Sequence, residues 1–149
     1  MVSIVITQSD IVYFLLTDRF CDGDPENNID VNLGNPLAYH GGDFKGIIKK
    51  IPYLKNLGVT AIWITPVYVN IHLPEEDSWG YHGYWTLNFE KVDQHLYSPS
   101  TETPEDSKKY IRELVDTLHN NRMKRILDIV VNHTGYNHPG QKDDPKHHH

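Results

Sequence analysis

Three short apolar runs divide the chain and predict β-strands. They cover residues 11–16, 59–65 and 125–131, and nearly every position in each run is hydrophobic. Strands that are apolar at successive positions, rather than at every second one, are typical of a parallel sheet covered on both faces. We therefore expect these three strands to be buried on both faces.

A helix is predicted between the first two runs. From Asp43 onward, apolar side chains recur at spacings of three and four, and Gly58 stands at the position where helices commonly end. Pro52 removes a backbone donor inside this segment. We expect a kink at this proline, or two short helices in place of one.

A second helix is predicted before the third run. Thr103 is placed as its N-cap and Pro104 as its first residue, and an apolar stripe then extends over 110–118. Asn120 or Asn121 is expected to adopt the left-handed conformation that ends the helix. The order strand, helix, strand, helix, strand predicts right-handed crossovers in a parallel sheet.

Three parallel strands and two helices do not close into a complete fold. A barrel of eight strand–helix units needs about 250 residues, and an open parallel sheet needs helices on both faces. The chain has 149 residues. It is therefore expected to form a short open sheet that another chain completes, or to be part of a longer protein.

Two long polar or aromatic segments separate these elements. They cover residues 21–42 and 67–100, and neither shows the apolar periodicity of a helix. Long loops in compact domains are usually functional, so we expect binding or catalytic residues in these two segments.

Composition excludes several classes of partner. Against 14 Lys and Arg stand 20 Asp and Glu, and Lys49-Lys50 is the longest basic run, so a nucleic-acid partner is not expected. No stretch approaches the roughly 18 apolar residues of a membrane span, and residues 1–10 lack the basic start of a secretory signal. Cys21 is the single cysteine, which rules out an internal disulfide.

The first loop is rich in oxygen-bearing side chains. Asp22, Asp24, Asn27 and Asn28 are followed by the sequence Gly41-Gly42-Asp43. Such hard oxygen ligands suit Ca²⁺, which binds six to eight oxygens. The spacing is not that of an EF-hand, and a solvated turn rich in Asp and Asn is the alternative interpretation.

The second loop contains the sequence Trp79-Gly-Tyr81-His82-Gly-Tyr84-Trp85. Flat aromatic faces beside an imidazole suit sugar rings, which stack on aromatics and need hydrogen-bond partners. The alternative is a loop that its aromatic residues anchor in a core.

The third run carries polar residues toward its end. Asp128 is expected inside the strand as a buried carboxylate, whereas Asn132 and His133 follow the strand. In parallel α/β folds, ligands bind beyond the carboxyl ends of the strands. Asn132 and His133 therefore point to a site, while Asp128 is either structural or catalytic.

Four ordered stretches resemble the N-terminal part of the α-amylase family of glycoside hydrolases, glycoside hydrolase family 13. They are DRFCDGDPENN at 18–28, YHGGDFKGI at 39–47, YHGYW at 81–85, and the pattern from Asp128 to His133 of an aspartate, three residues and then Asn-His. Bacterial α-amylases and cyclodextrin glycosyltransferases carry stretches of this type. The likeness covers nearly everything from residue 10 to about residue 139.

The resemblance implies an α/β fold that is a partial (β/α)₈ TIM barrel, with the first three β-strands, two helices and long β–α loops. Residues 1–146 would form the truncated N-terminal part of the catalytic barrel, and 147–149 a His-tag remnant. It implies a parent enzyme that acts on α-1,4-glucans such as starch and maltooligosaccharides. That enzyme is expected to be secreted, although the localisation of this chain stays open.

The resemblance also implies binding residues. The glycosyltransferase-like members of the family have a calcium site near the first strand, and the residues that match it are Asp22, Asp24, Asn27, Asn28, Gly41 and Asp43. Asn132 matches a ligand of a second calcium site that is more widely shared in the family. The residues that match the sugar-binding positions are His82, Tyr84, Trp85 and His133, with Tyr84 stacking under the sugar. Asp128 matches an architectural residue beside the catalytic centre.

No catalytic residue of the family is matched. Its nucleophile and acid/base carboxylates, about 5 Å apart as in other retaining glycosidases, belong to barrel strands beyond the end of this chain. The chain alone is therefore expected to be inactive or very weak. One alternative is a non-catalytic fragment that binds calcium and carbohydrate. Another is an unconventional hydrolase that recruits carboxylates from among Asp43, Glu75, Glu76, Asp77 and Asp128.

Departures from the family pattern occur at Pro52, Arg122 and Arg125, and they concern local packing. An open sheet also exposes unpaired backbone groups at both edges and an uncovered apolar face. We therefore expect a homo-oligomer in which copies of the chain supply the missing barrel wall.

Overall fold

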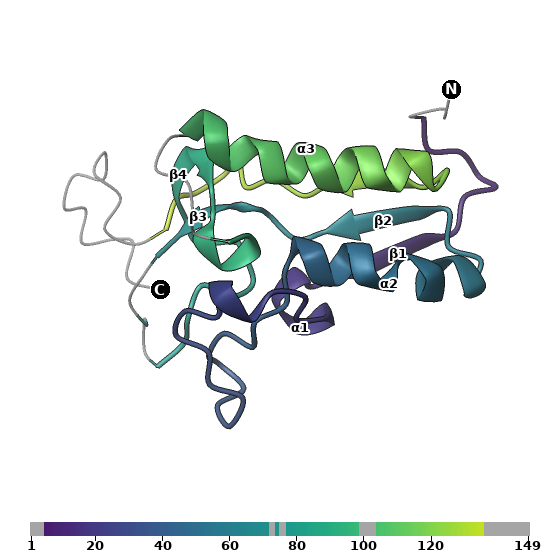
Figure 1. Cartoon of the computed structure of the whole chain (residues 1–149). Helices are drawn as coiled ribbons and strands as arrows, with labels where there is room; N and C mark the ends of the chain where they lie inside the picture. Colours follow the sequence, from purple (N-terminus) through teal and green to yellow (C-terminus); the bar gives the residue numbers. More distant parts are fainter. Residues whose placement is uncertain (1–4, 72–73, 75–76, 99–103, 136–149) are drawn as a thin grey trace.

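The computed structural model describes residues 5–71, 74, 77–98 and 104–135 of the chain (Figure 1). Its elements follow one another as β1 (Val12–Leu15), α1 (Thr17–Phe20), η1 (Pro25–Asn27), α2 (Phe44–Asn56), β2 (Ala61–Ile64), β3 (Tyr68–Asn70), β4 (Thr86–Val92), η2 (Gln94–Leu96), α3 (Pro104–Asn120) and β5 (Lys124–Leu127). Within these described residues, no helix is long and apolar enough to cross a membrane.

The three predicted strands form a parallel sheet in the order β1-β2-β5. Phe14 is in register with Trp63, and Trp63 with Ile126. The predicted strands, their parallel direction and the two intervening helices are therefore confirmed. Figure 1 shows α2 and α3 lying along the sheet.

One face of this sheet forms the core. Leu15, Ile62 and Ile64 pack there with apolar residues of both helices, among them Ile47 and Leu114. The prediction of burial on both faces is wrong for the outer two strands and for Trp63. Exposure is 40% at Val12, 51% at Phe14 and 39% at Trp63. Within the described residues, α2 and α3 pack on the opposite face and leave these side chains uncovered.

Helix α2 begins where Asp43 caps it, because the Asp43 side chain accepts a hydrogen bond from the Gly46 backbone N–H. It ends before Gly58, which has the left-handed φ of 80° predicted for it. Pro52 lies inside one continuous helix, so the alternative of two short helices is wrong. Ile51 and Leu54, on either side of the proline, are both buried in the core.

Helix α3 ends differently from the prediction. Arg122, rather than Asn120 or Asn121, has a positive φ, of 60°. Asn121 remains part of the helical pattern because its backbone N–H donates to the Thr117 carbonyl at 3.1 Å. Thr103, the predicted N-cap, lies outside the described residues.

Both long loops contain structure that the sequence pattern did not indicate. The first contains η1 and a bridge between Val31 and Tyr39. The second contains the antiparallel strands β3 and β4, followed by η2. These additions lie near the carboxyl ends of the parallel strands, so both loops are built around the same edge of the sheet.

Candidate functional site

A tyrosine and an aspartate meet beyond the carboxyl ends of β2 and β5. The Tyr84 hydroxyl donates to Asp128 Oδ2 at 2.7 Å, and the Asp128 backbone N–H donates to the Ile64 carbonyl at 3.1 Å. β5 ends at Leu127, so the prediction that Asp128 lies buried inside the strand is wrong. Asp128 is half-buried and lies one residue beyond the carboxyl end of β5.

Two histidines flank Tyr84. The His82 Nδ1 atom accepts the Tyr84 backbone N–H at 3.0 Å, and His133 Nε2 lies 2.9 Å from the Tyr84 carbonyl. The His82 and Tyr84 rings are stacked with centroids 5.8 Å apart, and the Trp85 ring meets His82 edge-on at 4.5 Å. His82, Tyr84, Trp85 and His133, all predicted as sugar-binding residues, are thus neighbours. We call them, with Asp128, the aromatic cluster.

Charge states within the aromatic cluster follow from burial. Burial and the nearby Arg19 lower the pKa of His82, so its ring is neutral at pH 7. Because Nδ1 accepts a hydrogen bond, the proton of the neutral ring resides on Nε2. Burial, together with the hydrogen bond to Asp128 and its charge, raises the pKa of Tyr84 to about 12. Tyr84 therefore remains a donor to the Asp128 carboxylate.

Trp85 is held by the polypeptide backbone. The Trp85 backbone N–H donates to Asn70 Oδ1 at 2.8 Å, and the Trp85 backbone carbonyl accepts the Ile71 backbone N–H at 3.1 Å. The two interpretations of the aromatic loop are therefore compatible, because the same segment is anchored by backbone bonds and presents half-buried rings. Asn132 is exposed, and within the described residues its side chain makes no hydrogen bond.

The first loop is organised around Asp43, which is fully buried. Its carboxylate accepts from the backbone N–H groups of Gly23, Asp24 and Gly46, and from Asn27 Nδ2 at 3.1 Å. Burial raises the pKa of Asp43, and these donors oppose that effect. The carboxylate joins the loop to the first turn of α2.

Two amide oxygens in this loop are left without a donor. Asn27 Oδ1 and Asn28 Oδ1 are both buried and make no hydrogen bond. The nitrogen of each amide is engaged, since Asn27 Nδ2 binds Asp43 and Asn28 Nδ2 donates to Asp22 Oδ2 at 2.7 Å. Gly41, with a φ of 87°, brings its backbone close to Asn28 Oδ1. Unpaired buried oxygens of this kind fit a hard cation.

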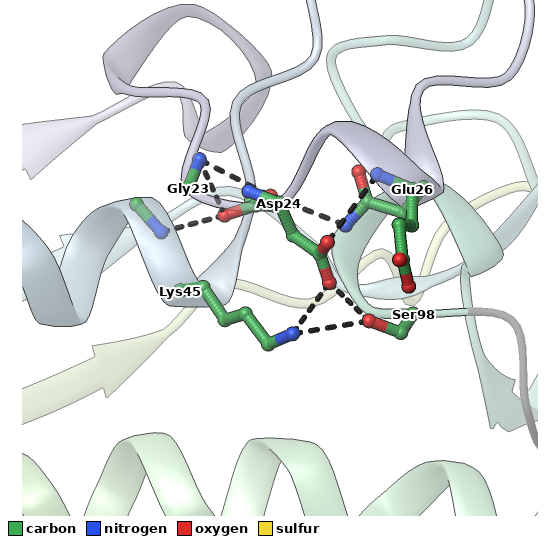
Figure 2. A network of polar contacts seen from close by, with 8 residues as sticks. Gly23, Asp24, Glu26, Lys45 and Ser98 are labelled. Atoms are coloured by element: carbon green, nitrogen blue, oxygen red, sulfur yellow. Dashed lines mark hydrogen bonds and ion pairs between the residues drawn. The ribbon is translucent and has the colours of Figure 1, made fainter.

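Asp24 is engaged elsewhere. Its Oδ2 atom accepts from Lys45 Nζ at 2.6 Å and from the Ser98 hydroxyl (Figure 2). These bonds to Lys45 and Ser98 lower the pKa of Asp24. Among the described residues, no three His, Cys, Asp or Glu side chains are grouped as for a metal ion. A cation in this loop would therefore depend on amide and backbone oxygens as well as carboxylates.

Sequence reasoning missed two residues that connect the sites. Asp18 Oδ1 accepts the backbone N–H groups of His40 and Gly41, so it fixes the glycine beside Asn28. The Arg19 guanidinium lies over the Tyr81 ring, 3.9 Å from its centroid. The two adjacent charged residues shortly after an apolar strand were the signal in the sequence that could have indicated both.

Comparisons with known proteins agree on one family. The protein-family model of the α-amylase catalytic domain matches residues 14–148 of this chain. A β/α-amylase of Paenibacillus polymyxa is 41% identical over 133 residues, covering 87% of this chain and 10% of that protein. A cyclomaltodextrin glucanotransferase of Klebsiella oxytoca is 38% identical over 138 residues, covering 87% of this chain and 20% of its own length.

Solved structures give the same result. An Anoxybacillus α-amylase superposes with a TM-score of 0.74 at 45% identity, covering 87% of this chain and 25% of that one. The γ-type cyclodextrin glucanotransferase of Bacillus clarkii gives a TM-score of 0.75 at 34% identity, with coverages of 85% and 19%. These neighbours are TIM-barrel enzymes, and the described fold is a partial α/β barrel of the predicted class. The chain spans about a tenth to a quarter of the length of these relatives.

Proposed function

We propose that this chain, which belongs to the α-amylase catalytic-domain family of glycoside hydrolases, holds α-1,4-glucans such as starch and maltooligosaccharides at the aromatic cluster. The observation that carries the proposal is the bond from Tyr84 to Asp128, which fixes an aromatic ring beside two histidines. Such a surface offers a flat face for a sugar ring and donors for its hydroxyls. One related α-amylase, from Geobacillus thermoleovorans, was solved in complex with acarbose.

Replacing Tyr84 with serine is expected to weaken maltoheptaose binding about 10- to 100-fold, because it removes the ring and the hydroxyl bonded to Asp128. Isothermal titration calorimetry measures this change. Tyr53→Ser is the matched control, since Tyr53 is a half-exposed tyrosine on α2. Equal binding by Tyr84→Ser and the unmodified chain would refute the proposed glucan site.

Cleavage is a separate question from binding. A retaining glycosidase needs two carboxyl groups about 5 Å apart. The Asp128 carboxylate already accepts from Tyr84, and the Asp43 carboxylate caps α2. Asp77 is exposed, while Glu75 and Glu76 lie outside the described residues. We therefore propose that glucan binding without turnover describes this chain alone. Release of chromophore from a chromogenic maltooligosaccharide, co-eluting with the protein on a sizing column, would favour the unconventional hydrolase instead.

We further propose that the first loop binds Ca²⁺. Asp22, Asn27, Asn28 and Asp43 would hold it, together with backbone oxygen from the Gly41 region. The unpaired amide oxygens of Asn27 and Asn28 support this assignment, because a buried acceptor without a donor is costly. A second calcium ion at Asn132 remains a proposal of the family resemblance alone.

Self-association through the open sheet is also proposed. Phe14 and Trp63 are exposed neighbours, with ring centroids 5.1 Å apart, and within the described residues β1 and β5 each pair only with β2. Replacing both aromatics with serine is expected to weaken association at least about 10-fold in analytical ultracentrifugation, since it removes the apolar contact surface. Leu33→Ser, at a loop position exposed to 72%, is the control. A monomeric unmodified chain at high concentration would refute the proposal.

A further inference from the structure

We infer that Lys45 and Ser98 are positioning residues for the proposed calcium loop, and that the Asp24 carboxylate binds these two residues instead of the metal. The inference rests on the calcium site proposed above. Figure 2 shows the arrangement, in which the Asp24 side chain points toward Lys45 and Ser98. The three residues come from three separate segments: the turn before η1, the first turn of α2, and the residue that follows η2 by two positions.

Both carboxylate oxygens of Asp24 accept hydrogen bonds, and one of the donors is an ammonium group. Oδ2 accepts from Lys45 Nζ at 2.6 Å and from the Ser98 hydroxyl, and Oδ1 accepts the Glu26 backbone N–H at 3.3 Å as the cap of η1. The side chain is 8% exposed, so breaking these bonds would leave a buried charge without its partners. The Lys45 ammonium neutralises this carboxylate and would repel a cation placed beside it, whereas the donors to Asp43 are all uncharged N–H groups.

The contrast with the neighbouring amides is direct. Asn27 and Asn28 have their nitrogens bound and their oxygens without a donor, whereas both oxygens of Asp24 are occupied. Among the buried side-chain oxygens of residues 22–28, only these two amide oxygens lack a donor within the described residues. Asn27 and Asn28 are therefore assigned as calcium ligands, and Asp24 as a residue that holds the loop in position.

The contact between Asp24 and Lys45 lies at the first turn of α2, which Asp43 caps. Lys45 lies between Asp43 and Gly46, whose N–H binds Asp43 Oδ1 at 2.6 Å. Asp24 contacts both sides of this turn, because its backbone N–H donates to Asp43 Oδ2 at 2.8 Å and its carboxylate accepts from Lys45. The bond to Lys45 thus sets the position of η1, and with it Asn27, relative to the Asp43 carboxylate. Replacing a residue that holds a metal ligand in position typically lowers metal affinity 10- to 100-fold.

A double-mutant cycle on calcium affinity tests the inference. Lys45→Met and Asp24→Asn should each weaken Ca²⁺ binding about 10-fold in calorimetric titration of the metal-free chain, and the double variant should be no weaker than either. Ser98→Ala removes one neutral donor and should weaken calcium binding about 3-fold. Lys45→Arg keeps the positive charge and should retain most of the calcium affinity. Lys49→Met is the matched control, because it removes the same charge from an exposed position on α2.

The outcomes separate the two levels of proposal. Loss of binding beyond about 100-fold in Asp24→Asn, with Lys45→Met unchanged, would make Asp24 a direct ligand and overturn the inference. Unchanged affinity in all variants would also overturn it while leaving the calcium site intact. No calcium binding by the unmodified chain would overturn the site itself. Thermal unfolding in EDTA confirms that each variant is folded before titration.

Discussion

Replacing Asp43 with alanine is expected to lower the free energy of unfolding by about 3–5 kcal/mol, even without calcium. The Asp43 side chain is fully buried and accepts from the backbone N–H groups of Gly23, Asp24 and Gly46 and from the Asn27 amide. Alanine would remove the cap of α2 and leave these donors without a partner. Urea unfolding in the presence of EDTA, followed by circular dichroism, measures the change.

Asp22→Ala is the control for this substitution. Asp22 is an exposed acidic residue in the same loop, and its carboxylate accepts only the Asn28 amide among the described residues. We expect a change below about 1 kcal/mol in EDTA, as for other surface substitutions. If Asp43→Ala were equally mild, the loop would not depend on the buried carboxylate as described.

Removal of calcium is expected to lower the melting temperature of the chain by about 10 °C. At a calcium concentration about a thousandfold above Kd, binding stabilises the folded state by roughly 4 kcal/mol, which is a shift of this size for a chain of this length. Differential scanning calorimetry in EDTA, and then with excess CaCl₂, measures the loss and its recovery. MgCl₂ should restore less, because Mg²⁺ requires a tighter octahedral site.

The shift in melting temperature should depend on the two amide oxygens that lack a donor, those of Asn27 and Asn28. The double substitution of Asn27 and Asn28 by alanine should abolish the response to calcium, whereas Asn56→Ala, at an exposed position at the end of α2, should retain it. A melting temperature that is the same with EDTA and with calcium in the unmodified chain would refute the proposed site.

The sequence was most informative about elements with a strong local signal. The apolar runs and helical spacings predicted all three parallel strands and both long helices, and Gly58 marked a helix end correctly. The same apolar runs misled about burial at Phe14 and Trp63. A hydrophobic run reports the environment that a strand requires, but it contains no information about which segment covers each face.

Contacts between distant segments were beyond prediction from pattern alone. The bond between Tyr84 and Asp128 joins residues 44 positions apart, and nothing local to either residue specifies the other. Lys45 is similar, because a lysine on the surface of a predicted helix is indistinguishable from its neighbours until Asp24 is placed beside it. The strands β3 and β4 were missed because their half-exposed residues lack a clean alternation.

The pairing of the parallel sheet has a consequence for how the chain folds. Val12 pairs with Ala61 and Ala61 with Lys124, so each strand must find a partner about fifty or sixty residues away along the chain. The entropy of closing such loops is lost before the strand contacts stabilise the structure. β2 is the central strand and pairs with both others, so the sheet cannot form before β2 is in place. Stopped-flow refolding should therefore be slow for a chain of this size, and a substitution such as Ile62→Ala should slow it further.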